Sequence, residues 1–262
     1  RDFCLSRGLG DVYKRQGTWT AIAVGDAFAC GIKTGGTAWC WGSDTYGNLG
    51  NNTSLTNSLT PVQVSGTGWT QIDAASMFVC GIKSAGTAWC WGYGNYGQMG
   101  NGTTNVSNPV PVQVSGSGTW TSITAGSSFA CGVKTGGTGW CWGLNDDGRL
   151  GNGNETNRST PGQVSGAWKH IDAGSGYTCG LKTDNTAWCW GKNNNGQLGI
   201  GNLVTPKMTP VAVTGGGTWN SIAADLVSCG IKSTGVGYCW GYGGRLGTGD
   251  TTTRSSPTQL AE

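Results

Sequence analysis

The chain contains few charged side chains, a single histidine and no long apolar run. Charged residues make up 11% of its 262 residues and the net charge is +3, whereas roughly 25% charged residues is usual for a globular protein. The Lys and Arg residues form no block of the kind that binds the phosphates of nucleic acid. No stretch approaches the ~18 consecutive apolar residues that a membrane-spanning helix needs. We therefore expect neither a nucleic-acid partner nor a membrane span.

Residue types that carry catalysis are equally sparse. The histidine, His170, is expected at the exposed start of a strand. Asp73 and Asp172 occupy the same position in two copies of a repeated unit, but the other copies have Ala or Thr there, so no acidic residue recurs at a fixed position. The sequence also contains no Walker-type phosphate loop. Two carboxylates from distant units can still pair as in a glycosidase. Our prediction is nevertheless a chain without enzymatic activity, catalytic residues, metal or cofactor.

Glycine, tryptophan and cysteine are abundant, and they recur in five copies of one unit spaced by 48–51 residues. Each unit begins with W-x-x-I, continues through two cysteines and a Trp-Gly pair, and ends with G-x-[LM]-G and P-x-x-[VL]. We expect one domain over 17–262, made of the repeats 17–66, 67–116, 117–166, 167–216 and 217–262.

Residues 1–16 match none of these units and are unusually rich in charge. They lack a starting Met and the apolar core of a signal peptide. We expect this segment to be an expression or sequence-assembly artefact that is foreign to the native protein, whose own N-terminus is then missing.

Short apolar runs of four to seven residues in each unit, bounded by Gly, Asn and Thr, indicate β-strands. No window shows the 3.6-residue period of an amphipathic helix. Four short strands in each unit are typical of a propeller blade, and a solenoid of β-hairpins is the alternative. The predicted fold class is thus all-β, a β-propeller of five four-stranded repeats, which form either a five-bladed ring or a fragment of a six- or seven-bladed one.

The two cysteines of each unit flank a predicted hairpin. Its three-residue loop needs a last residue in the left-handed region. If Lys33 lies opposite Thr37, counting outward along both strands places Cys30 opposite Cys40. This is a non-hydrogen-bonded pair, in which the two Cα atoms approach to ~4.5 Å, a distance that a disulfide can span. The loop position in question holds residue types that tolerate positive φ in all five copies, namely Gly36, Gly86, Gly137, Asn185 and Gly235.

We therefore predict one cross-strand disulfide in each unit. Each contributes somewhat under about 3 kcal/mol by loop closure. Zinc ligation and redox chemistry, which favour C-x-x-C spacing, and reduced core cysteines are the weaker alternatives. Paired cysteines indicate an oxidising compartment, so we expect an extracellular or cell-surface protein. The pairs are Cys30–Cys40, Cys80–Cys90, Cys131–Cys141, Cys179–Cys189 and Cys229–Cys239.

Tryptophans flank the second cysteine of the pair. Because successive side chains of a strand point to opposite faces, Trp39 and Trp41 of the first unit should lie on the face opposite Cys40. Gly31, across from Trp39, leaves room there for an indole. We expect these rings to form the core between neighbouring blades. A surface stripe that binds sugars or bases is the alternative.

The elements W-x-x-I-x-A-G, C-G-[IL]-K, G-T-A-W-C-W-G, G-x-L-G-N-G and P-x-x-V resemble the regulator of chromosome condensation repeat. This repeat also occurs in alpha-tubulin-suppressor-like bacterial proteins. The resemblance covers residues 17–260 and implies a β-propeller, commonly of seven blades, whose members are binding proteins. They include a guanine-nucleotide exchange factor acting on a small GTPase at chromatin and secreted inhibitors of β-lactamases.

Two departures limit what the resemblance implies. The constant spacing leaves no insertion between blades that can act as an exchange wedge, so a guanine-nucleotide exchange factor is the least favoured function. The family also often has a His two residues before the first repeat cysteine, where this chain has Phe28, Phe78, Phe129, Tyr177 and Val227.

The loops after each Trp-Gly differ between copies and are the expected binding surface, because shared positions build the blade. The alternative is that their side chains are only solvated turn residues. The candidate binding residues are Asp44, Tyr46, Asn95, Tyr96, Asp146, Asp147, Asn194 and Tyr242. Glycosylation sequons, which also arise by chance in such loops, begin at Asn51, Asn52, Asn101, Asn105, Asn154 and Asn157.

Our hypothesis is a secreted or cell-surface propeller that binds another protein. A lectin-like propeller that binds carbohydrate at several equivalent sites is the second hypothesis. Equivalent sugar sites require near-identical loops, whereas these loops differ in charge, which favours the protein partner.

Overall fold

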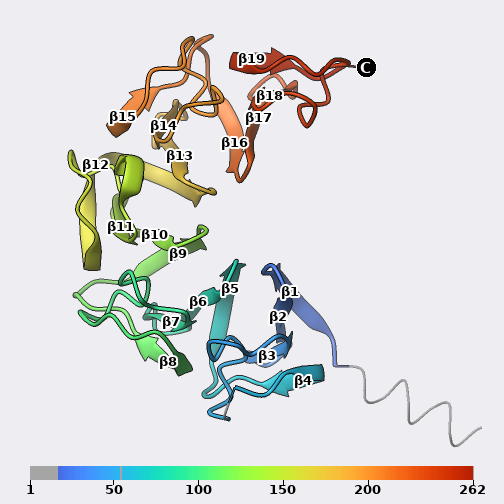
Figure 1. The fold of residues 1–262 in the computed structure, drawn as a ribbon, viewed down its shortest axis with the longest axis vertical. Helices are drawn as coiled ribbons and strands as arrows, with labels where there is room; N and C mark the ends of the chain where they lie inside the picture. Colours follow the sequence, from blue (N-terminus) through green and yellow to red (C-terminus); the bar gives the residue numbers. More distant parts are fainter. Residues whose placement is uncertain (1–16, 54, 262) are drawn as a thin grey trace, which may run out of the picture.

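The computed structural model of the chain describes residues 17–53 and 55–261. Segment 1–16, which we predicted to be foreign and which contains Cys4, lies outside the described residues. The described part consists of antiparallel sheets that lie side by side in an arc (Figure 1). The predicted all-β propeller architecture is confirmed. None of the described helical segments is long and apolar enough to cross a membrane.

Each blade is a meander that runs from the innermost strand of the arc to the outermost one. Blades 1 and 2 contain β1 (Trp19–Val24), β2 (Phe28–Lys33), β3 (Thr37–Gly42) and β4 (Ser58–Gln63), then β5 (Trp69–Ala75), β6 (Phe78–Lys83), β7 (Ala88–Gly92) and β8 (Asn108–Gln113). Blade 3 contains β9 (Trp120–Ala125), β10 (Phe129–Lys134), β11 (Thr138–Gly143), the short 3₁₀ helix η1 (Asp146–Gly148) and the first part of β12 (Arg158–Ala173). Blades 4 and 5 contain the rest of β12, β13 (Tyr177–Lys182), β14 (Ala187–Gly191) and β15 (Lys207–Ala212), then β16 (Trp219–Ala224), β17 (Val227–Lys232), β18 (Gly237–Gly241) and β19 (Arg254–Gln259).

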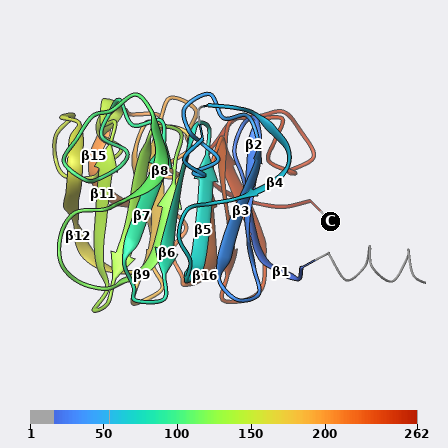
Figure 2. The same cartoon turned by 90° about the horizontal axis from the view of Figure 1, so that it is seen from below.

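The strands run between two faces of the molecule (Figure 2). We call the face with the turns between the first and second strands, such as 25–27, and the long loops, such as 43–57, the loop face. The opposite hairpin face carries the tight turns such as 34–36. Because every blade has the same meander, loops of one kind always reach the same face.

Blades 3 and 4 share the 16-residue strand β12, which pairs with β11 over its first part and with β13 over its last part. These two blades therefore form one seven-stranded sheet, whereas the other three blades are separate four-stranded sheets. The repeat boundary that we placed between residues 166 and 167 falls inside this continuous strand.

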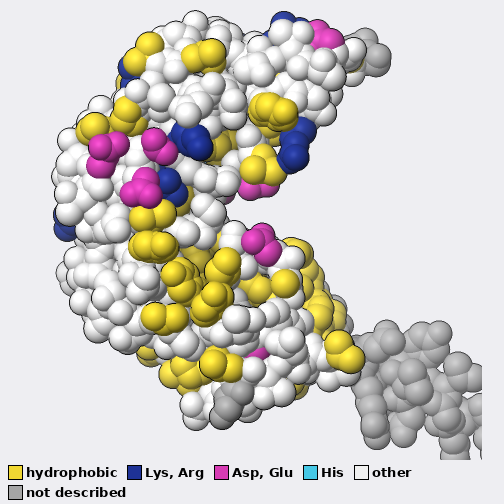
Figure 3. Space-filling model, viewed as in Figure 1, with side chains coloured by type: hydrophobic (Ala, Val, Ile, Leu, Met, Phe, Trp, Pro, Cys, Tyr) yellow, Lys and Arg dark blue, Asp and Glu magenta, His cyan; other side chains and the backbone are white. Residues whose placement is uncertain are grey.

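The five blades leave a gap between blade 1 and blade 5 (Figures 1 and 3). Ile22 on β1 is 56% exposed, although its counterpart Ile171 in blade 4 is 1% exposed. At the other end of the arc, Ile231 on β17 is 46% exposed, whereas Ile32 in blade 1 is 2% exposed. The open arc agrees with the predicted fragment of a larger propeller and not with a closed five-bladed ring.

The hairpins of the described blades have the predicted register. Lys33 lies opposite Thr37 and Cys30 opposite Cys40, and the Cα atoms of the paired cysteines are 4.0–4.1 Å apart in the five disulfides. The last loop residue has a positive φ in every copy, from 63° at Asn185 to 87° at Gly235. Turn chemistry thus sets the register, and the register brings the sulfurs together.

The core lies between the blades. The cysteine face of blade 1, with Cys30, Cys40 and Leu49, packs against Trp69 and Trp91 on the tryptophan face of blade 2. The same pairing of faces recurs at the following junctions. The interpretation of the tryptophans as the interblade core is confirmed.

One hydrogen bond repeats at every junction between described blades. The indole N–H of Trp142 in blade 3 donates to the carbonyl of Gln98 in blade 2 at 2.8 Å. A Cβ at Gly100, which has a φ of 66°, would meet the Trp142 Nε1 at 2.7 Å. The last glycine of G-x-[LM]-G is therefore required by the indole of the next blade. The equivalent bonds join Trp91 to Asn48, Trp190 to Arg149 and Trp240 to Gln197.

This repeated bond provides a stability test with a built-in control. Trp142→Phe should lower the free energy of unfolding by about 2–3 kcal/mol, because it leaves the buried Gln98 carbonyl without its donor and a cavity beside the phenyl ring. Trp41→Phe removes the same atom from blade 1, where no described residue accepts its N–H, and should cost less than about 0.5 kcal/mol. Urea unfolding followed by circular dichroism measures both, and equal losses would contradict this account of the junction.

Candidate functional site

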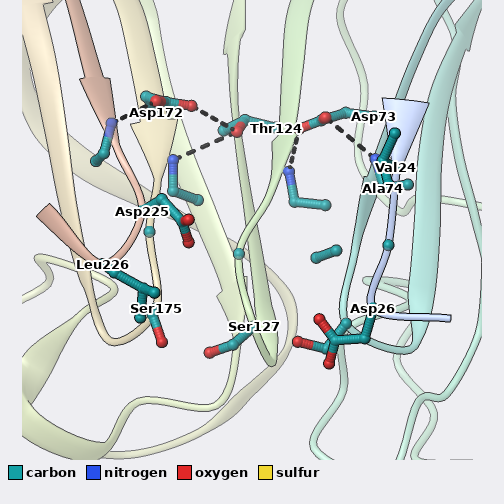
Figure 4. A pocket seen from close by; sticks show the side chains of 18 residues that line it. Val24, Asp26, Asp73, Ala74, Thr124, Ser127, Asp172, Ser175, Asp225 and Leu226 are labelled. Carbon is teal, nitrogen blue, oxygen red and sulfur yellow. Dashed lines mark hydrogen bonds between the residues drawn. The ribbon is translucent and has the colours of Figure 1, made fainter. Parts of the chain in front are cut away.

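The innermost strands surround a cavity of about 530 Å³ (Figure 4). Turns between the first and second strands of the five blades form its mouth on the loop face. One position of these turns carries a carboxylate or a hydroxyl in every copy, so the mouth is lined by hydrogen-bonding groups. The residues at this position are Asp26, Ser76, Ser127, Ser175 and Asp225.

Deeper in the cavity, a ladder of side chains links one blade to the next (Figure 4). Asp73 Oδ2 accepts a hydrogen bond from the backbone N–H of Ala125 in the next blade at 2.8 Å, and Asp172 Oδ2 accepts one from Ala224 at 2.7 Å. Between them, Thr124 Oγ1 accepts a hydrogen bond from the backbone N–H of Ala173 in blade 4 at 3.3 Å and donates one to Asp172 Oδ1 at 3.1 Å. The position shared by Asp73 and Asp172 in the sequence is therefore an interblade position.

The Asp73 carboxyl is the most perturbed acid of this ladder. Burial raises its pKa from 3.8 to about 6, the hydrogen bond from Ala125 opposes this rise, and the negative charge of Asp172 adds to it. The carboxylate form is thus disfavoured in the folded protein relative to the unfolded chain.

All charged residues that line the cavity are aspartates, namely Asp26, Asp73, Asp172 and Asp225. This local negative charge contrasts with the net charge of +3 on the whole chain. The arrangement suits a ligand that presents hydrogen-bond donors and positive charge. No group of three or more His, Cys, Asp or Glu side chains is placed to hold a metal within the part of the chain that the structure describes. His170 lies on β12 opposite Leu181 and does not line the cavity.

The structure places the candidate Asp44 inside its loop. Asp44 is fully buried, and its Oδ1 accepts a hydrogen bond from the Leu49 N–H at 2.9 Å. Asn145 and Asn193 hold the same position in blades 3 and 4, where their amide nitrogens also donate to loop carbonyls at 2.8 and 2.9 Å. Burial raises the pKa of Asp44, and hydrogen bonds from the backbone N–H groups of Leu49 and Thr56 oppose this rise. Asp44 therefore supports the loop instead of facing a partner.

Two other candidates, Tyr46 and Tyr96, meet on the loop face through Tyr93, which the sequence analysis did not select. The rings of Tyr46 and Tyr93 are 4.8 Å apart and those of Tyr93 and Tyr96 are 5.9 Å apart. Met77, 41% exposed, lines a groove of about 170 Å³ with Tyr46. We call Tyr46, Tyr93, Tyr96 and Met77 the tyrosine patch. The Tyr at the first loop position of both "YGNYG" and "YGG" was the sequence signal for Tyr93.

The remaining candidates lie apart from this patch. Asp146 and Asp147 lie on η1, where Asp147 Oδ2 is 3.9 Å from Arg149 Nη2. Asn95 and Asn194 are exposed, and Tyr242 is 53% exposed in blade 5. The structure thus brings together only two of the eight candidates.

The predicted sequons lie in the long loops of the loop face. Asn51 and Asn101 accept hydrogen bonds from the backbone N–H and the hydroxyl of the threonine two residues later. Asn157 accepts a bond from the Asn145 N–H at 2.8 Å. The side chains of these three asparagines therefore stabilise turns. The other predicted sequon residues, Asn52, Asn105 and Asn154, are exposed.

A second hollow, of about 440 Å³, opens on the hairpin face beside Trp140 and Pro161. The ammonium of Lys134 lies 4.5 Å from the ring centres of both Trp120 and Trp140, and it donates to the Ser117 carbonyl at 2.7 Å. Burial lowers the pKa of Lys134. A lysine between two aromatic rings recurs in the other blades as Lys33, Lys83, Lys182 and Lys232. The sequence showed that this lysine recurs at the same position of each repeat, but not that it lies between two aromatic rings.

Comparison with protein families confirms the repeat. A model of the regulator of chromosome condensation (RCC1) repeat matches residues 35–82, 85–133, 137–181 and 184–236. A second model of the same repeat matches residues 19–48, 120–149 and 168–197. No curated protein sequence matches the chain significantly.

Several solved structures are similar to this one. Human WBSCR16 is 17% identical, with a TM-score of 0.84 over 93% of this chain and 67% of that chain. Prp20p from Saccharomyces cerevisiae, described with its binding to Gsp1p and histones, is 18% identical, with a TM-score of 0.64 over 93% and 77%. The ectodomain of the receptor kinase CR4 from Physcomitrella patens is 22% identical, with a TM-score of 0.52 over 85% and 50%. At these identities the similarity is one of fold.

Titration of Asp73 should make stability depend on pH. Its folded pKa of about 6 exceeds the unfolded value of 3.8, so its protonated form stabilises the fold below about pH 4. That contribution, at most roughly 3 kcal/mol, is lost as the pH rises through 6. Asp73→Asn should remove this part of the pH dependence between pH 4 and pH 7, and denaturant unfolding at several pH values measures it. An unchanged profile would mean that Asp73 does not titrate in this range.

The loop position of Asp44 should require the side chain that suits its own blade. Asn145→Asp should lower the free energy of unfolding at pH 7 by about 1–3 kcal/mol, since the hydrogen bonds that its amide nitrogen donates to the carbonyls of Asn154 and Thr156 are lost. Asp44→Asn should also be destabilising, because an amide NH2 group cannot accept the bond that the Asp44 carboxylate accepts from the backbone of Thr56. Thermal unfolding of both variants tests this, and an Asn145→Asp variant as stable as wild type would refute it.

Proposed function

The chain belongs to the regulator of chromosome condensation (RCC1) repeat family, and we propose that it is a non-catalytic module that binds another protein in an extracellular or cell-surface setting. The observation that carries the proposal is the tyrosine patch on the loop face. The ring of Tyr93 contacts those of Tyr46 and Tyr96 at interplanar angles of 60° and 73°, beside the exposed Met77. Tyrosine and methionine are enriched in protein interfaces, and tyrosine rings add contact area at a small cost in side-chain entropy.

Two further observations support this proposal. The yeast relative Prp20p binds proteins, namely Gsp1p and histones. The five disulfides are typical of proteins that fold outside the reducing cytosol.

A lectin-like function is the second candidate, and the hollow beside Trp140 favours it. Trp140, Thr138 and Lys134 line this hollow, and an indole face with nearby hydroxyls and peptide groups suits a sugar ring. The same Lys, Thr and Trp spacing occurs in blades 1 to 4. Equivalent sites of this kind provide the repetition that the varied loops of the opposite face lack.

Protein capture from the extracellular fraction of the source organism distinguishes the two functions. We expect at least one captured protein to bind wild type with a measurable Kd, and Tyr93→Ala/Tyr96→Ala to weaken that binding tenfold or more, because hot-spot tyrosines typically contribute over about 1.4 kcal/mol. Thr34→Ala/Thr183→Ala on the exposed hairpin face is the matched control and should bind as wild type does.

A different outcome would favour the lectin. If binding survives the tyrosine double variant but is lost on enzymatic deglycosylation of the partner and in Trp140→Ala, the protein-binding proposal is wrong. A glycan array with wild type and Trp140→Ala gives the same distinction directly. Circular dichroism of every variant confirms that the fold is retained.

A further inference from the structure

We propose that the groove beside Tyr46 takes an arginine side chain of the partner, with its guanidinium directed at Asp26. This inference rests on the proposed protein-binding function and names the chemical group that the loop face selects. The groove lies between blades 1 and 2, and its lining includes Asp26, Phe28, Tyr46, Asn48 and Met77.

The size of the groove points to a single side chain. Its volume is about 170 Å³, below the roughly 300–1,000 Å³ of pockets that hold drug-sized ligands. One long side chain that projects from a larger protein surface fits a space of this size.

The walls are apolar and already in position. Phe28 is 5% exposed, whereas Met77 is 41% exposed, so the aliphatic part of a long side chain can pack on both. Asn48 fixes the two sides of the groove, because its Nδ2 donates to the Met77 carbonyl at 2.6 Å and its Oδ1 accepts from the Tyr46 N–H at 3.1 Å. Asn48 is itself 3% exposed. Such preorganised walls lose little entropy when a ligand binds.

In blade 3, an arginine side chain of the protein itself occupies the position that corresponds to the groove. Arg149 occupies the position of Asn48, and Phe129 the position of Phe28. The Arg149 guanidinium lies 5.8 Å from the centre of the Phe129 ring. Its Nε donates to the Asp146 carbonyl at 2.8 Å, and the side chain is 9% exposed. In blade 1 the shorter Asn48 stands in place of this arginine and Met77 in place of Gly176, and the groove beside them is open to a guanidinium from a partner.

The charge of the site agrees with this occupant. Asp26 is exposed at the rim, where it lines both the groove and the central cavity (Figure 4). The central cavity contributes Asp73, Asp172 and Asp225, and neither lining contains Lys, Arg or His. The tyrosine ring adds a cation–π surface for a guanidinium.

The three methionines of the chain provide the readout. Met77 lines the groove, Met99 is fully buried in blade 2 and Met208 lies on β15. We suggest labelling the methionine methyl groups with ¹³C and titrating the full chain with N-acetyl-arginine methylamide, using the uncharged N-acetyl-citrulline methylamide as the control ligand. We expect a saturable shift of the Met77 methyl signal alone, with a Kd on the order of millimolar for an isolated side chain, and little or no shift with citrulline.

Two variants and one matched control sharpen the test. Asp26→Asn should weaken arginine binding threefold or more and reduce its salt dependence. Asn48→Arg places the guanidinium of blade 3 in blade 1 and should abolish the Met77 shift. Glu155→Gln removes an exposed carboxylate of a blade 3 loop that lines neither the groove nor the central cavity, and it should bind as wild type does.

The outcomes separate this inference from the proposed function. Equal shifts with arginine and citrulline, no Met77 shift at saturating ligand, or an unaffected Asp26→Asn variant would each overturn the arginine site. If the captured partner still binds through the tyrosine patch in those cases, the protein-binding function stands without it. Loss of partner binding in Asn48→Arg and Asp26→Asn, but not in Glu155→Gln, would support both.

Discussion

The contact between an indole and a glycine turn holds this molecule together. A tryptophan of each blade after the first places its N–H on a carbonyl of the preceding blade and its ring against the last glycine of the G-x-[LM]-G turn. Because the turn belongs to the long loop, the same contact also fixes the base of that loop. The loops that differ between blades are thus anchored by the part of the repeat that does not differ.

This anchoring explains how one repeat supports different surfaces. Asn48, Gln98, Arg149 and Gln197 all supply the carbonyl that the next indole requires, so their backbone role is constant. Their side chains differ in length and make different contacts: Asn48 bonds to the Met77 carbonyl of blade 2, whereas Arg149 bonds within its own loop. Variation at this position therefore changes the space beside the loop, while the backbone contact to the next indole is retained.

The sequence was sufficient to predict the blade, because the blade depends on local rules. Positive φ at Asn185 and its glycine counterparts set the hairpin register, and alternation then placed Cys30 and Trp39 on opposite faces. The junction ladder through Asp73 and Thr124, and the meeting of Tyr46 with Tyr93, involve residues about 50 positions apart. Pattern within one repeat carries no information about which side chain of the next repeat lies opposite. Asp44 was selected because it is polar and variable, but only the structure shows that it turns inward.

The shared strand β12 makes blades 3 and 4 different from the other neighbours. Blades 1 and 2, 2 and 3, and 4 and 5 are connected by short Gly- and Ser-containing segments such as 64–68 and 114–119, whereas β12 passes from one blade to the next without leaving the sheet. A change in chain length at one of these connections alters a turn, whereas at β12 it would break a continuous hydrogen-bonded ladder. The middle of the arc is therefore one continuous sheet that the backbone itself holds together, whereas the other junctions depend on side-chain packing and on the indole bonds.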